Sequence, residues 1–133
     1  MQSPIQGSTI DPSFSGVEID IMESFSPGKV SHNLHWNGCG EDWQSAGKPT
    51  FEIENPEEFH RFGLKWDDSG YTFYVDGEES WHIDGPVSNM EQFILISTEC
   101  MGYRKAAQIP DERLKDALGD FFAVDYIRVF DSI

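Results

Sequence analysis

Apolar and polar side chains alternate with a period of two along much of this sequence. Val17, Ile19 and Ile21 alternate with acidic residues, and residues 30–36 alternate apolar side chains with Ser31, Asn33 and His35. This pattern is typical of strands with one buried and one solvated face. Similar patterns predict further strands over residues 60–66, 71–75 and 80–83.

Turn-forming residues separate these segments. Residues 67–70 (Asp-Asp-Ser-Gly) and 76–77 (Asp-Gly) predict two hairpin turns. Residues 93–96 are apolar on both faces, which predicts a central strand, and a last strand is expected over 121–130. Residues 110–118 carry the signals of one short helix, whereas residues 7–16, 38–49 and 85–90 are rich in turn formers. The sequence therefore predicts an all-β fold, an antiparallel β-sandwich.

Composition limits the ligands of this sandwich. The length of 133 residues fits one domain, residues 1–133. The net charge of −15 repels phosphate backbones, so we expect no nucleic-acid partner, and it disfavours anionic membranes and heavily sulfated polymers less strongly. No apolar stretch is long enough for a membrane span. Neutral polysaccharides remain open as ligands. Cys39 and Cys100 would form a disulfide or remain free thiols, and the sequence leaves both open.

Three carboxylates stand close together in the first predicted strand. Glu18 and Asp20 are two residues apart, so both side chains leave the same face. Glu23, at an odd offset, would point into the apolar face of a regular strand, where an ionised side chain is costly to bury. One extra residue around Ile21 and Met22 removes this conflict. We therefore predict a β-bulge that returns Glu23 to the face of the other two acids.

Clustered carboxylates repel one another, which points to a metal or to chemistry unless the strand simply carries an acidic, solvated face. A retaining glycosidase needs two carboxyl groups about 5–5.5 Å apart. One attacks the anomeric carbon, and the other, with a raised pKa, protonates the leaving oxygen and later activates water. A third carboxyl between them can hydrogen-bond one partner and keep the two pKa values apart.

Residues 18–23 (Glu-Ile-Asp-Ile-Met-Glu) match the bulged Glu-x-Asp-x-x-Glu signature of glycoside hydrolase family 16 and resemble its laminarinase-type branch. Further segments that agree with the family, in order along the chain, are residues 32–36, 59–66, 74–77 and 124–129. The resemblance implies that Glu18 is the nucleophile, Asp20 the assisting carboxylate and Glu23 the acid/base. It also implies a concanavalin A-like jelly roll that cuts a β-linked glucan or galactan internally with retention of configuration.

Other residues are candidates for binding the substrate. Asn33, His35 and Asn37 share the polar face of the strand that follows the carboxylates, where they would contact sugar hydroxyls, the carboxylates, or simply neighbouring strands. Trp43 lies in a Gly-rich loop that suits a sugar-stacking platform, and Trp81 follows a hairpin. Glu99 is a further candidate at the cleft, and Asp125 is a weak candidate ligand of a structural calcium ion.

No metal site is expected beyond that weak candidate. A calcium ion takes six to eight oxygen ligands, and Asp125 supplies only part of such a set. His32 and His35 are three apart, so on a strand they face opposite ways and do not share a metal ion. Trp36 and Trp66 alternate with core positions, which assigns them to packing.

The sequence departs from the family in length, since such β-sandwich enzymes often need about 200–250 residues. The strands that would precede residue 17 in the family are expected to be lacking here. The chain is then a fragment of a longer protein, a truncated product that folds poorly, or a minimal form whose open sheet edges are covered by a second copy or by a missing N-terminal segment. The alternatives to an enzyme are a non-catalytic, lectin-like sugar-binding module and an inactive truncation. The likeness implies a secreted or periplasmic full-length form.

Overall fold

The computed structural model describes residues 11–38, 40–98 and 122–131. The chain divides into two compact units, residues 1–95 and 96–133, and the first holds every described helix and strand. The first element is the single turn α1 (Pro12–Ser15). Asp11 caps it by accepting a 2.9 Å hydrogen bond from the Ser13 amide, and Pro12 suits a first helical position, where no amide donor is needed. In the described part of the chain, no helix is long and apolar enough to cross a membrane.

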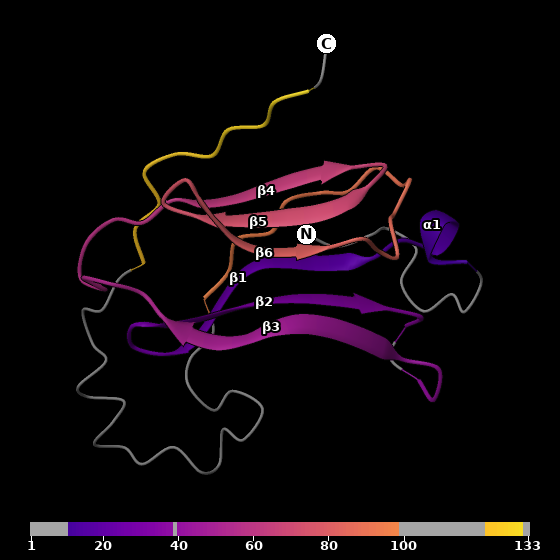
Figure 1. The fold of residues 1–133 in the computed structure, drawn as a ribbon, viewed down its shortest axis with the longest axis horizontal. Coiled ribbons are helices and arrows are strands. Elements are labelled where there is room, and N and C mark those ends of the chain that lie inside the picture. The colour runs from indigo at the N-terminus through magenta and orange to yellow at the C-terminus, as the bar shows by residue number, and fades with distance from the viewer. Residues whose placement is uncertain (1–10, 39, 99–121, 132–133) are drawn as a thin grey trace. The chain divides into compact units, whose positions relative to one another are not determined.

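The first sheet consists of β1 (Glu18–Ser26), β2 (Lys29–Trp36) and β3 (Gln44–Glu52), with β2 in the middle and all pairs antiparallel (Figure 1). β1 and β2 confirm the strands that the alternation predicts. β3 lies where turns were expected, because the Gly and Pro of residues 44–52 weaken its alternation. Pro49 is tolerated because β3 is an edge strand, where the missing amide donor faces no partner strand.

The second sheet consists of β4 (Phe62–Asp67), β5 (Gly70–Val75) and β6 (Glu78–Ile83), with β5 in the middle (Figure 1). Both predicted hairpin turns are confirmed: Asp67 pairs with Gly70 across one, and Val75 pairs with Glu78 across the other. At the second turn Asp76 and Gly77 both have positive φ, the backbone that a tight two-residue hairpin requires.

The apolar core forms between the two sheets. Residues from both sheets are fully buried in one cluster: Val17, Ile19, Leu34, Tyr71 and Phe73. Trp36 and Trp66 pack against this cluster, which confirms their assignment to packing. Each large apolar side chain buried in this way contributes about 1.5–3 kcal/mol. The architecture is therefore nearly all β, and its antiparallel sheets agree with the predicted β-sandwich class.

Two predicted strands are wrong. Residues 93–96 form no strand apart from an isolated bridge at Phe93, and each of their four apolar side chains is more than two-fifths exposed. Residues 122–131 are also irregular, and the side chains of Val129 and Phe130 are largely exposed. Alternation reports which side chains could share a face, whereas a strand also requires a hydrogen-bonded neighbour. The predicted helix over 110–118 lies outside the described residues.

Candidate active site on the polar face of the first sheet

A bulge in β1 decides which side chains share the polar face of the first sheet. Asp20 pairs with Asn33, and Glu23 pairs with Ser31. Between these two pairs the register moves by three residues along β1 but by only two along β2. The extra residue falls at Ile21 and Met22, which confirms the predicted β-bulge. Directly paired residues have side chains on the same side of the sheet. Glu18, paired with His35, therefore leaves the same face as Asp20 and Glu23.

Asn33 fixes the orientation of Glu23. Its side-chain amide donates a short hydrogen bond to Glu23 Oε2 and lies 3.4 Å from Ser31 Oγ. Gly47 on β3 makes room for this side chain, because a Cβ at position 47 would lie 2.2 Å from Asn33 Oδ1. The sequence singled out Asn33 but not Gly47. A glycine inside a strand is a general signal of close approach, although it does not name the approaching group.

Asp20 is the carboxylate with the most perturbed proton affinity in this group. Burial, together with the charges of Glu23 and Glu18, raises the pKa of Asp20 to about 7. Its Oδ2 lies 3.2 Å from His35 Nε2, and 17% of its side chain remains exposed. Burial and like charges both disfavour the ionised form. Asp20 therefore holds a proton over much of the range below neutral pH.

An aromatic ring borders the carboxylates. The Trp43 indole stacks on the His35 imidazole, with ring centroids 5.5 Å apart and planes 19° apart. Trp43 is 48% exposed, so one side of the ring remains open to a ligand. His35 and Trp43 therefore lie in one contact group with Asp20, as their selection as binding candidates anticipated. That arrangement leaves their role in binding sugar as a prediction.

Two polar atoms beside this group are buried and have no hydrogen-bond partner among the described residues. They are His35 Nδ1 and Asn37 Oδ1. Asn37 follows the end of β2 with a φ of 63°, in a left-handed backbone conformation that Asn adopts more readily than most residues. Buried polar atoms are usually satisfied, so these two are exceptions among the described residues.

Trp81 does not join this face. Trp81 pairs with Phe73 on β5, and their ring centroids are 5.1 Å apart within the packing between the sheets. The expectation of an open Trp81 platform is corrected, because the register of the β5–β6 hairpin places it toward the core. Asp125 lies in the other compact unit, and Glu99 lies outside the described residues. No group of three or more His, Cys, Asp or Glu side chains in the described segments is arranged to hold a metal ion.

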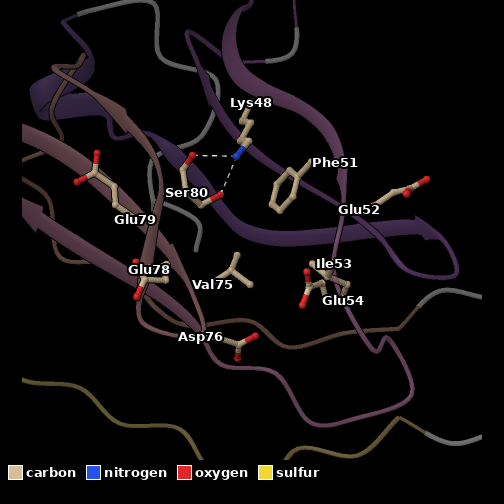
Figure 2. Close-up of a pocket in the computed structure, with 10 residues that line it drawn as sticks. All are labelled: Lys48, Phe51, Glu52, Ile53, Glu54, Val75, Asp76, Glu78, Glu79 and Ser80. Carbon is tan, nitrogen blue, oxygen red and sulfur yellow. Dashed lines mark hydrogen bonds between the residues drawn. The ribbon is translucent and has the colours of Figure 1, made fainter.

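An open hollow of about 340 Å³ lies elsewhere, between the end of β3 and the β5–β6 hairpin. Figure 2 shows that Phe51 and Val75 line it, and that Lys48 reaches Ser80 at one end. Glu18, Asp20 and Glu23 do not line this hollow. The carboxylate face, where three acids converge, is therefore the better candidate for chemistry.

Comparisons with known proteins identify the family of this chain. A β-porphyranase C from Zobellia galactanivorans is 39% identical to the chain over 49 residues, which cover 35% of this chain and 14% of that protein. This chain therefore matches only a small part of the relative's length. No solved structure matches the chain. The model of the family described as "Glycosyl hydrolases family 16" matches residues 8–93, a segment that includes both sheets and all three carboxylates. The chain thus belongs to glycoside hydrolase family 16.

Proposed function

We propose that this chain carries the catalytic carboxylates of an endo-acting, retaining glycoside hydrolase that cleaves β-linked polysaccharides. The observation that carries this proposal is the bulge between Asp20 and Glu23, which places three carboxylates on one sheet face. A merely solvated strand would not require a register shift that brings a third acid beside two others. Bulges that re-aim a side chain are frequent next to active sites.

The proposed roles are those that the resemblance to the family implies for the three acids. Glu18 attacks the anomeric carbon and forms a glycosyl-enzyme bond while the glycosidic bond breaks. Glu23 gives its proton to the departing oxygen, then takes a proton from the water that releases the sugar from Glu18. The contact with Asn33 holds the Glu23 carboxyl in one orientation through both steps. Asp20, which retains a proton up to about pH 7, limits the build-up of negative charge between them.

Sugar binding is assigned to the aromatic and amide groups beside the acids. The open side of Trp43 would stack on the apolar face of a pyranose ring. The partly exposed side chain of His35, and Asn37 at the end of the same strand, would exchange hydrogen bonds with ring hydroxyls. A site built in this way recognises neutral sugar surface, which is compatible with a strongly acidic chain.

The choice of polysaccharide is between a β-glucan and a β-galactan. The bulged signature resembles laminarinase-type sequences and suggests a β-1,3-glucan, whereas the relative is named for porphyran. We propose a member of this glucan or galactan class as the substrate. We further propose that residues 1–133 belong to one catalytic domain and that the enzyme acts outside the cytoplasm, where such polymers are found.

The test measures new reducing ends after incubation with β-1,3-glucan, mixed-linkage β-glucan and porphyran. We expect the wild-type chain to release oligosaccharides from at least one of them, and Glu18→Gln to release none. Glu78→Gln, on the exposed edge of the second sheet, is the matched control and should retain wild-type activity. Equal activity of wild type and Glu18→Gln would overturn the assignment.

A calorimetric titration of the same polysaccharides separates the enzyme from a binding module. Tight binding without turnover, unchanged in Glu18→Gln, would favour a lectin-like function for this face. The expectation that a second copy covers an open sheet edge remains a prediction. Sedimentation at two protein concentrations tests it, since a dimer would show a concentration-dependent mass.

A further inference from the structure

His32 occupies the position on β2 that faces the bulge. Its neighbours Ser31 and Asn33 pair with Glu23 and Asp20, so His32 alone stands opposite Ile21 and Met22. Its side chain points away from the carboxylate face and is completely buried between the sheets. The imidazole stacks on Phe73 of the second sheet, with ring centroids 4.9 Å apart.

The His32 imidazole contacts the backbone of the bulge on the core side of the sheet. His32 Nδ1 lies 2.6 Å from the carbonyl oxygen of Ile21, inside the bulged segment. A carbonyl oxygen only accepts hydrogen bonds, so Nδ1 must carry the hydrogen and donate it. A bulge disrupts the local ladder of backbone hydrogen bonds, and a buried carbonyl without a partner would be unfavourable. The side chain that faces the bulge therefore satisfies one of the groups that the bulge exposes.

The other ring nitrogen is held by the second sheet. His32 Nε2 lies 3.0 Å from Ser80 Oγ on β6, and Lys48 Nζ lies 3.1 Å from the same hydroxyl. Lys48 can only donate, so the Ser80 hydroxyl is free to donate to Nε2. Lys48 then donates to Ser80, Ser80 donates to His32, and His32 donates to the carbonyl oxygen of Ile21. Figure 2 shows the Lys48–Ser80 end of this chain.

The electrostatic surroundings favour the neutral ring that this chain requires. Burial lowers the pKa of His32, and the nearby Lys48 charge lowers it further, against the opposite effect of the Ile21 carbonyl. A neutral imidazole with hydrogen on Nδ1 both donates to Ile21 and accepts from Ser80. The tautomer is therefore set by contacts on both sides of the ring.

We propose that His32 is a positioning residue that holds the bulge, and with it Glu23, in the geometry needed for proton transfer to the leaving group. This inference rests on the proposed glycosidase function. The bulge begins after Asp20 and ends at Glu23, so a change in the Ile21 peptide moves Glu23 relative to the nucleophile Glu18 at the start of the same strand. His32 never touches the substrate face, and it acts only through the backbone of β1.

Two replacements separate the donor from the bulk of the ring. His32→Asn retains an amide donor near the position of Nδ1, whereas His32→Gln places its amide near the position of Nε2 and leaves Ile21 without a donor. Both are assayed on the polysaccharide that the wild type cleaves and on an aryl glycoside of the same sugar. A good aryl leaving group needs little protonation, so the ratio of the two activities reports on the acid/base rather than on overall folding.

We expect His32→Gln to lose on the order of 100-fold in kcat/KM on polysaccharide, as for a misplacement of about 1 Å, with a much smaller loss on the aryl glycoside. His32→Asn should keep the wild-type ratio. Thermal melts accompany each variant. If His32→Gln does not fold, Ser80→Ala is assayed in its place. Without the Ser80 hydroxyl, nothing fixes the hydrogen of His32 on Nδ1. The ratio of polysaccharide activity to aryl-glycoside activity should then fall about tenfold.

The outcomes distinguish the two proposals. A wild-type chain that cleaves neither substrate overturns the glycosidase function and the positioning role together. A wild-type chain that cleaves both, with the same activity ratio in every folded variant, overturns the positioning role alone.

Discussion

The two sheets of this molecule differ in regularity. In the second sheet, β4 and β5 pair without interruption, and the two hairpins close with two-residue turns. One register shift, between Phe73 and Tyr74, interrupts the β5–β6 pairing. In the first sheet, register shifts interrupt β1 twice and the β2–β3 pairing once. The first sheet also carries the clustered carboxylates on its polar face. The second sheet packs beneath it through Tyr71 and Phe73 and supplies Ser80 to the buried imidazole of His32.

This difference suggests that the second sheet mainly stabilises the fold, whereas the first sheet positions the candidate catalytic residues. The second sheet, with a single register shift, is the more regular of the two, and its cross-strand pairs mainly contribute to stability. The irregular pairing of the first sheet brings acids together that electrostatics alone would keep apart, at a cost in stability that the packed core must offset. Changes on the polar face of the first sheet should therefore mainly affect activity, and changes in the core-facing residues of the second should mainly affect stability.

The largest effect on activity, after loss of the nucleophile, is expected from Glu23→Gln. Without its proton donor the chain should lose about 100- to 10,000-fold in kcat on polysaccharide. Glu79→Gln, on β6 of the second sheet, is the matched control and should leave kcat unchanged. Reducing-end assays measure both. Comparable kcat values for Glu23→Gln and Glu79→Gln would contradict the assignment of catalysis to the first sheet.

The largest effect on stability is expected in the second sheet. Phe73 is fully buried against Trp81 and His32, so Phe73→Ala should lower the free energy of unfolding by about 3–5 kcal/mol. Phe25 on β1 is 79% exposed, and Phe25→Ala should change it by less than about 0.5 kcal/mol. Urea denaturation followed by tryptophan fluorescence measures both. The packing account fails if the two variants unfold at the same urea concentration.

Asp20 gives a smaller effect that depends on pH. Its folded-state pKa of about 7 lies above the value of 3.8 expected in an unfolded chain, so the folded state binds more protons between these values. Stability therefore falls as pH rises from about 4 to 7. Relative to Asp20→Asn, the wild type should lose about 1–3 kcal/mol between pH 4 and pH 8, a reduced figure because solvent reaches part of the side chain.

Asp67 in the second sheet is the natural contrast. Hydrogen bonds from Lys65 and Ser69 lower the pKa of the Asp67 carboxyl, so its contribution to stability is lost on acidification rather than on alkalinisation. Denaturant titrations of Asp20→Asn between pH 4 and pH 8, and of Asp67→Asn below about pH 4, should give difference curves of opposite slope. Parallel curves would show that Asp20 is not perturbed as described.

The smallest effect is expected from Trp43→Ala. An aromatic contact of this kind contributes about 0.5–1.5 kcal/mol, so KM should rise roughly two- to tenfold with little change in melting temperature. Trp81→Ala should do the reverse, because Trp81 packs in the core. Steady-state kinetics and thermal melts of the two variants reveal the pattern. A fall in melting temperature for Trp43→Ala that matches that of Trp81→Ala would argue against an open platform.

Much of the fold could be predicted because alternation and turn chemistry act locally. The strands β1, β2, β4, β5 and β6, both Asp-rich hairpin turns and the bulge at Ile21 and Met22 all follow from short patterns. β3 was missed because Gly47 and Pro49 interrupt its pattern, although pairing with β2 stabilises it. Residues 93–96 were placed in a sheet because apolar runs do not reveal whether a neighbouring strand exists.

Residues of the candidate site could be predicted where their odd or even position along a single strand decides which face they occupy. Asn33 and His35 follow from β2 alone, whereas Trp81 was misplaced because its orientation depends on the register across a hairpin. The contact between His32 and Ile21 requires both the bulge and the opposite strand, and the contact with Ser80 requires the second sheet. Only the folded chain brings these groups together.

The most direct test of the central claim is the stereochemistry of the first product. Proton NMR, recorded within the first minutes of polysaccharide cleavage, distinguishes the two anomers of the new reducing end before they equilibrate. With Glu18 as nucleophile and Glu23 as acid/base on one face of the sheet, the account predicts that the β-anomer appears first. Initial release of the α-anomer would mean inversion, which requires carboxyl groups about 6.5–9.5 Å apart and would contradict the arrangement proposed for this bulge.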